Sequence, residues 1–321
     1  REMVLDLMRG EQAFDLQEIG RRIADICFGE LNSQKQVIIQ ILLLTIVAAV
    51  FANYTNVFEK SQTADISFYL IYLILVMILL KAFLEMESMV MEAVKQVTSF
   101  LKALLPIYLL AAAFANGSLT AIGFSEMTLV MITILQWILK VVILPGIHLC
   151  VILSILNHLN QEDRFSKFAK LIRMVLVWAL KTIAGIVIGF QTVQCLVMPA
   201  VDSLKTSLLR KAAGSIPGIG NIFNSVTEAV LGSAMVVKNA VGAAGMIIMA
   251  MICLMPLFKI AVCVILYRLL AAVTQPVSDR RLTMCVESVG DGADLLLKVV
   301  LTTGLMFFVS LALVTAFLRG G

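Results

Sequence analysis

Several long apolar runs of this sequence are interrupted by basic and amide side chains, and these are the residues whose types could carry chemistry. An ionisable group inside a membrane span is costly and usually faces a bundle interior, a cavity or the interface. The set therefore predicts either a polar path through a helix bundle or lysines that reach the lipid headgroups with their long stems. Its members are Lys140, Lys181, Lys259 and Lys298, with Gln136, His148, Gln191 and Gln194 as polar neighbours.

Position within the runs separates the four lysines. Lys298 lies near the start of its run and Lys181 about two turns into its own, which favours contact with headgroups. Lys140 and Lys259 are more central, so they are the stronger candidates for a polar path. We expect no acidic residue midway along a span to pair with them, which argues against a proton relay or an ion-coupled carrier.

Signatures of catalysis and of metal binding are missing from this sequence. It has no HExxH, no GxSxG and no phosphate-binding loop motif. Ser288-Val-Gly-Asp291 resembles the GxGD of intramembrane aspartyl proteases, but serine replaces the first glycine and we expect no second aspartate within a span. The six cysteines form no CxxC and no cluster with histidine. We predict that the protein is not an enzyme and holds neither a metal nor a cofactor.

The runs that position these side chains indicate a membrane protein. Of the 321 residues, 60% are hydrophobic and 14% are charged, and the mean hydropathy is +0.99, whereas soluble domains are about 45–50% apolar and about 25% charged. A net charge of +4, spread along the chain, argues against nucleic-acid binding. Crossing a bilayer takes roughly 20 apolar residues in a helix. The runs that meet or approach this length are 37–54, 66–84, 100–115, 127–157, 174–198, 243–272 and 294–318. We expect the helix of the short run 100–115 to extend back through the amphipathic stretch 86–99.

We therefore predict an all-α polytopic integral membrane helix bundle of about seven spans. Proline removes a backbone donor and bends or breaks a helix. Kinked or broken helices are expected at Pro106, Pro145, Pro199 and Pro256. Gly185 and Gly189 form a GxxxG pattern, which lets two helix backbones approach closely. Their partner is either another helix of this chain or a helix of another subunit.

The remaining segments divide the chain. Residues 1–36 are predicted to be an amphipathic amino-terminal helical segment, and 37–321 the polytopic membrane domain. The chain starts at Arg1, so a segment upstream, such as a signal peptide, is expected. Seven alternating spans would put the amino terminus and the loops at 85–99, 158–173 and 273–293 on the cytoplasmic side, whereas a cleaved signal peptide would leave the terminus outside.

Two of the connecting segments, 158–173 and 201–240, differ from simple loops in their sequence patterns. Residues 158–173 repeat basic side chains every three residues, as in Lys167, Lys170 and Arg173, which predicts a basic interfacial helix. The segment 201–240 is either an extramembrane helical hairpin or a re-entrant element beside the other helices. We expect it to contact a partner through Lys205, Arg210, Lys211 and Asn221.

A faint internal repeat relates two helix pairs, 127–198 and 243–318. Leu144-Pro145 and Cys150-Val-Ile-Leu153 resemble Met255-Pro256 and Cys263-Val-Ile-Leu266, and the following helices carry Lys181 and Lys298. Parallel repeats of this kind occur in transporters. Short apolar matches also arise by chance, so duplication and coincidence both stay open.

Longer stretches, in matching order over residues 30–318, point to a family. They are Ala103-Leu-Leu-Pro106, Ile143-Leu-Pro145, Phe168-Ala-Lys-Leu-Ile-Arg173, Gln194 at the end of a matching span, Gly214-Ser-Ile-Pro-Gly-Ile-Gly-Asn-Ile-Phe223, Ser233-Ala-Met-Val-Val-Lys-Asn-Ala-Val-Gly242, Ala271-Ala-Val-Thr-Gln-Pro276 and Leu305-Met-Phe-Phe308. In these stretches the chain resembles the stage III sporulation protein AE family of endospore-forming Firmicutes.

The resemblance implies a place and a role. It implies a polytopic component of the secretion-like or feeding channel complex that links mother cell and forespore during engulfment, in the mother-cell-derived membrane around the forespore. The implied partners are the other membrane proteins of that stage III complex, and a homo-oligomer stays open. We expect a non-enzymatic membrane subunit, acting as platform or conduit. The alternative is a self-contained permease that moves a small solute.

Overall fold

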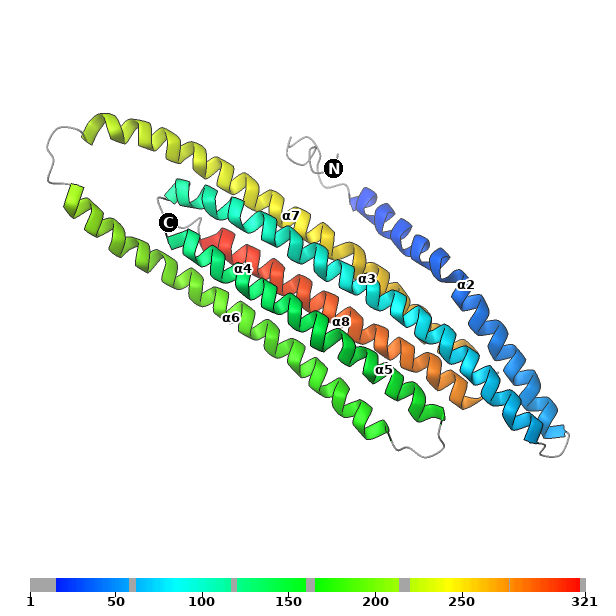
Figure 1. Cartoon of the computed structure of the whole chain (residues 1–321). Coiled ribbons are helices and arrows are strands. Elements are labelled where there is room, and N and C mark those ends of the chain that lie inside the picture. The colour runs from blue at the N-terminus through cyan, green and yellow to red at the C-terminus, as the bar shows by residue number, and fades with distance from the viewer. Residues whose placement is uncertain are drawn as a thin grey trace.

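The structure is a bundle of long helices. The computed structural model describes residues 16–57, 62–116, 120–159, 165–213, 220–276 and 278–317, and every regular element in them is helical. The elements are α2 (Leu16–Val57), α3 (Gln62–Asn116), α4 (Thr120–Ile138), η1 (Leu139–Ile143), α5 (Leu144–Leu159), α6 (Ser166–Ala213), α7 (Gly220–Thr274) and α8 (Arg280–Phe317). Because α4, η1 and α5 follow one another directly, they form one rod, and the six rods alternate in direction along the bundle (Figure 1).

Six of the described helical stretches are apolar and long enough to cross a membrane. They are Phe28–Ala48, Tyr69–Tyr108, Glu126–His158, Ser166–Val197, Ala240–Thr274 and Arg280–Leu313. The rods exceed the membrane in length: α3 and α7 have 55 residues each, which at a rise of 1.5 Å per residue is about 80 Å. A hydrocarbon core is about 30 Å thick, so much of each rod lies outside any single hydrocarbon layer.

Two predicted spans, 66–84 and 100–115, are a single helix. The expectation that the helix of the second span extends back through 86–99 is confirmed, and the predicted break that separates it from 66–84 is wrong. The stretch 85–99 contains no glycine or proline. Its buried side chains, such as Met86, Val90 and Val94, lie on one helical face, while Glu92 and Lys95 lie on the exposed face. The polar stretch is therefore the amphipathic middle of α3, and six candidate spans replace the predicted seven.

The predicted loop at 273–293 is also mostly helical. α7 ends at Thr274 and α8 begins at Arg280. The side-chain Oδ1 of Asp279 accepts a hydrogen bond from the backbone N–H of Arg281 at 2.8 Å, as an N-cap residue does. The acidic residues that follow in this stretch are thereby carried on a helix.

The four prolines have different surroundings. α3, α6 and α7 each continue as one helix through Pro106, Pro199 and Pro256. Pro145 directly follows the π-helical turn η1 and Leu144, and a proline ring clashes with the carbonyl four residues earlier, which a wider turn relieves. Kinks at the other three prolines stay a prediction.

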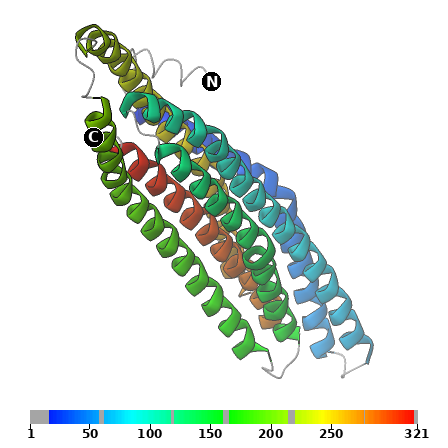
Figure 2. The same ribbon diagram turned by 60° about the vertical axis from the view of Figure 1, so that its left-hand side comes forward.

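α8 is the central helix of the bundle. It packs against α3, α5, α6 and α7, and 56% of an apolar stretch of 18 residues within α8 is buried. Two apolar clusters fill the space between the helices, one around Tyr267, Val289 and Leu296 and one around Tyr108 and Phe307. α2 lies at the edge of the bundle, on α3 and α7 (Figure 2). Because α2 runs unbroken across residue 36, the predicted division there does not coincide with a helix end, and it stays a prediction.

Candidate functional site: polar side chains of the membrane helices

The four lysines singled out from the sequence lie at nearly one level of the bundle. Levels are counted along the bundle, and ‘below’ means towards the end where α8 begins. A Cβ on Gly304 of α8 would lie 3.2 Å from the Cys253 sulfur of antiparallel α7, so these two residues are at the same level. Lys298 and Lys259 each lie six residues below this contact and are therefore level with each other. A Cβ on Gly146 of α5 would lie 2.8 Å from Leu176 of antiparallel α6. Lys140 lies six residues above Gly146 and Lys181 five residues above Leu176, so these two lysines are level to within one residue.

Three of the same four lysines are exposed on the outside of the bundle, and the fourth is half-buried. Arg173 of α6 forms ion pairs with Asp291 and Asp294 of α8. Counted from this contact, the levels of Lys181 and Lys298 differ by at most about one helical turn of 5.4 Å. Lys140, Lys181 and Lys298 are exposed and Lys259 is half-buried. We call this set, Lys140, Lys181, Lys259 and Lys298, the lysine ring. Its members do not converge on an interior path.

Charge-free sequence begins at the lysine ring and continues to one side of it. Residues 182–201 of α6, 239–258 of α7 and 299–318 after Lys298 each contain 20 residues without a charged side chain. This is the length that about 30 Å of hydrocarbon requires. Lysines at the end of such a stretch can place their amines among headgroups. The geometry therefore favours the second of the two roles predicted for them, although the role itself stays a prediction.

His148, predicted as a polar neighbour, meets an acidic residue of another helix. Its Nδ1 lies 2.9 Å from Glu87 Oε2 of α3, and the Phe83 ring contacts the imidazole edge-on at 5.9 Å between centroids. The Glu87 side chain is only 13% exposed and that of His148 28%. Glu87 is thus an acidic partner within α3 for His148 and not for a lysine, and the expectation that no acidic residue midway along a span pairs with the central lysines stays a prediction.

Two further predicted polar neighbours also reach across helix interfaces. Lys102 Nζ of α3 donates to Gln136 Oε1 at 3.3 Å. The Thr128 hydroxyl of α4 donates to Gln194 Oε1 of α6 at 3.1 Å. Within the described helices Gln191 differs, since its buried Oε1 has no hydrogen-bond partner there. These amides thus tie neighbouring rods together in pairs.

The most extended charged cluster joins α6 to α8, and sequence reasoning missed it. Arg173 Nη1 donates to Asp291 Oδ2 at 2.5 Å, and Nη2 lies 3.4 Å from Asp294 Oδ2. Lys298 Nζ donates to the same Asp294 oxygen at 2.7 Å. We call these four residues the Arg173 cluster. Residues 273–293 were expected to be a loop, which hid the fact that both aspartates share one face of a helix with Lys298.

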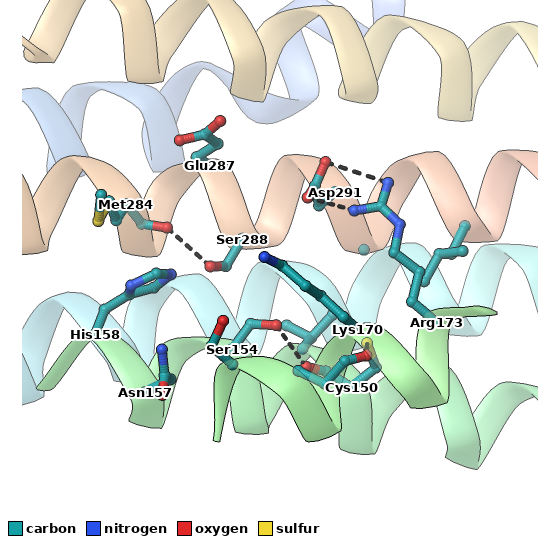
Figure 3. Close-up of a pocket in the computed structure, with 15 residues that line it drawn as sticks. Cys150, Ser154, Asn157, His158, Lys170, Arg173, Met284, Glu287, Ser288 and Asp291 are labelled. Carbon is teal, nitrogen blue, oxygen red and sulfur yellow. Dashed lines mark hydrogen bonds and ion pairs between the residues drawn. The ribbon is translucent and has the colours of Figure 1, made fainter. Parts of the chain in front are cut away.

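A cavity of about 260 Å³, lined by both apolar and polar side chains, lies beside the Arg173 cluster, between α5, α6 and α8 (Figure 3). Lys170, predicted to be part of a basic interfacial helix, extends from α6 across this cavity towards α8. A second cavity, of about 880 Å³, lies between α7 and α8 and shares Glu287 and Asp291 with the first. Other polar side chains that line the first cavity are Ser154, Asn157, His158, Ser166 and Ser288.

The predicted GxxxG face has no neighbour within the described chain. A Cβ added at Gly185 or at Gly189 would have no heavy atom within 4 Å among the described residues. Of the two partners predicted for this face, another helix of this chain is therefore not observed in the part that the structure describes.

The predicted partner-contact residues can be placed only by their helices. Lys205, Arg210 and Lys211 belong to the last turns of α6, and Asn221 to the first turn of α7. The glycine-rich residues 214–219 lie outside the described residues. The two helices form a hairpin that extends beyond the other rods (Figure 1). Contact with a partner there stays a prediction.

Long apolar helices in an all-helical bundle, with their polar groups paired across helix interfaces, define a polytopic helical membrane protein. A family model described as stage III sporulation protein AE matches residues 1–317. This chain belongs to that family, which confirms the resemblance noted from its sequence and implies a role in spore formation. The chain is similar to the stage III sporulation protein AE of Bacillus subtilis (strain 168), with 25% identity over 312 residues, which cover 97% of this chain and 78% of the relative. No solved structure matches the chain.

Proposed function

We propose that this chain is a non-enzymatic membrane subunit of the channel complex between mother cell and forespore, and that it acts as the membrane platform of that complex. In this proposal it lies in the mother-cell-derived membrane around the forespore and contacts other membrane proteins of the stage III complex. Membership of the sporulation family supports the cellular role. The choice of a platform rests on the polar side chains.

One observation carries the choice: several charged and polar groups of the described helices are paired with each other across helix interfaces. Glu87 with His148, and Arg173 with Asp291, join rods to one another. The two apolar clusters occupy the space between the rods. A carrier places polar groups near the midplane where they can meet a substrate. Here Gln136, Gln194, Glu87 and Arg173 each have a protein partner on another helix, as expected of a rigid scaffold.

The experiment that tests this proposal is recovery of the tagged full-length protein from sporulating cells in mild detergent, followed by mass spectrometry. Recovery of other stage III membrane proteins in a fixed ratio is the expected result. A protein recovered alone, or only with copies of itself, would overturn the platform proposal. Solute flux in proteoliposomes would then become the measurement of interest.

The second function, a self-contained permease, draws support from helix direction. The rod α4–η1–α5 followed by α6, and α7 followed by α8, have the same order of directions (Figure 1), as a parallel repeat requires. Replacing Lys140 and Lys259 together by leucine separates the two functions. A platform keeps its partners and its spore yield, whereas a permease that uses these lysines loses transport while still folded. Lys95→Leu, at an exposed site of α3 outside the lysine ring, is the control.

A further inference from the structure

A buried carboxylate lies between α2 and the rest of the bundle. Glu30 of α2 is only 6% exposed, on the face with which α2 packs on α3 and α7. Asp25 and Lys35, the charged residues nearest to it along the same helix, are both exposed. No ion pair of the described residues includes Glu30. Because a carboxylate taken out of water without a countercharge is costly, a bound cation would be stabilising at this position.

The contacts of the Glu30 carboxylate with the described residues are made by neutral groups. Gln34 Nε2 donates to Glu30 Oε1 at 3.2 Å, and the Cys263 thiol of α7 donates to the same oxygen at 3.7 Å. Gln34 is only 4% exposed, and its own Oε1 has no hydrogen-bond partner in the described part of the chain. A buried amide oxygen with unused lone pairs therefore lies next to a buried carboxylate.

A buried phenol of α7 is the third polar group of this set. Tyr267 is 0% exposed, and its hydroxyl has no hydrogen-bond partner among the described residues. Tyr267 follows Cys263 by four residues, so both lie on one face of α7, and a long helical side chain points back towards the preceding turn. The phenol is therefore directed towards the level of Cys263. It lies within electrostatic range of Glu30 and of the exposed Glu85 of α3.

We propose that Glu30, Gln34 and Tyr267 bind one alkali-metal cation, sodium or potassium, between α2 and α7. The Glu30 carboxylate supplies the negative charge, and Gln34 Oε1 and the phenol oxygen of Tyr267 are the neutral ligands. Oxygen atoms of these kinds are the ligands that hard cations prefer. The cation gives the carboxylate its countercharge and gives each neutral oxygen the partner that it lacks among the described residues.

The charge of the site selects a monovalent cation. One carboxylate neutralises one positive charge, whereas a divalent ion would leave a positive charge in buried surroundings. Lys259, one turn from Cys263 on α7, also acts electrostatically here and would repel a second positive charge. The described residues bring together no group of three histidine, cysteine or acidic side chains, which is the kind of ligand set that transition metals usually have.

Such a cation would tie α2 to the bundle. α2 lies at the edge, on α3 and α7 (Figure 2), and Cys263, which contacts Glu30, lies four residues below Lys259 of the lysine ring. The site is therefore about 6 Å below the ring at 1.5 Å per residue. The exposed carboxylate of Glu85 attracts cations from water towards it. Binding of this kind would control how firmly α2 is held, whatever complex the chain belongs to.

The test is thermal unfolding of the full chain in detergent, at equal ionic strength, in sodium chloride, potassium chloride, calcium chloride and choline chloride. We expect sodium or potassium to raise the unfolding midpoint until the site is saturated. Choline, which is too large for the site, should give no such rise.

Three variants assign the response to the proposed ligands. Glu30→Gln should abolish the rise, and because it removes the buried charge, it should be at least as stable in choline chloride as the unmodified protein. Tyr267→Phe should move saturation to about tenfold higher cation concentration, the size of one contact between a neutral oxygen and a charge. Asp25→Asn is the matched control, because Asp25 is an exposed acidic residue of the same helix, and it should leave the response unchanged.

Three kinds of result would overturn the proposal. The same midpoint in sodium, potassium and choline chloride would leave water, or a proton on Glu30, as the partner of these groups. A rise that persists in Glu30→Gln, or that Asp25→Asn removes as well, would reduce the response to a general effect of salt. A rise in calcium chloride with none in sodium or potassium chloride would contradict the monovalent charge of the site.

Discussion

Gly292 is the position where one added methyl group should do the most damage. A Cβ there would lie 2.3 Å from Val151 Cγ2 of α5 and 2.8 Å from Phe83 Cε2 of α3. Both neighbours are buried, at 2% and 0% exposure, and a valine in a helix has one strongly preferred rotamer. Neither side chain can turn away, so α8 itself has to move outward from α3 and α5.

The expected magnitude for Gly292→Ala follows from two opposing terms. Alanine in a helix interior is favoured over glycine by about 1 kcal/mol. Overpacking a filled core costs about 1–3 kcal/mol, and a clash with two immobile neighbours belongs at the upper end. The net loss of stability is then about 2 kcal/mol. Because Phe83 also contacts His148 and Asp291 binds Arg173, the displacement should disturb both charged contacts.

Gly185→Ala is the matched control for this experiment. It also replaces a helical glycine by alanine, but its new Cβ would meet no heavy atom of the described residues within 4 Å. We expect it to be neutral or slightly stabilising, by up to about 1 kcal/mol. The measurement is thermal unfolding of both variants in the same detergent, followed by circular dichroism, with spore yield as a second readout. A Gly292→Ala protein as stable as Gly185→Ala would refute the close packing of α8 on α3 and α5.

Three further predictions concern the paired side chains and the open glycine face. Replacing Arg173 and Asp291 singly and together by alanine should give a coupling energy of about 0.2–1 kcal/mol in a double-mutant cycle, since the pair is partly exposed; additive effects would contradict the pairing. His148→Leu should cost about 1–3 kcal/mol because it leaves the nearly buried Glu87 carboxylate without its partner, and Glu87→Gln in the same protein should recover part of that loss in thermal unfolding. Gly185→Leu should leave the unfolding midpoint in detergent unchanged, and a marked fall would show that this face packs within the chain after all.

Local patterns predicted the helices, but contacts between distant residues could not be read from them. The apolar runs lie within helices, and the amphipathic stretch 86–99 indicated a helix, but two spans were predicted where α3 is one helix without a glycine or proline between them. The pairing of Arg173 with Asp291 joins positions 118 residues apart, and no periodicity within one helix encodes such a partner. For the lysine ring a signal was present: three charge-free stretches of 20 residues each begin at one of these lysines.

The levels of the helices supply a further argument for a subunit rather than a solitary protein. Glu30 of α2 approaches Cys263 of α7, four residues below Lys259 in the lysine ring. The exposed Leu43 and Val50 of α2 therefore lie below the ring, on the opposite side from the charge-free stretches, and so does Leu70 of α3. Glu87 pairs with His148, which lies eight residues below Lys140 of the ring. Leu70 lies a further 17 residues below Glu87 on α3, so Leu70 is about 37 Å below the ring at 1.5 Å per residue. A single hydrocarbon layer about 30 Å thick cannot hold both apolar zones. Exposed apolar surface of this extent marks an interaction site, so one of the two zones needs a second apolar partner, as a platform within a larger membrane complex would have.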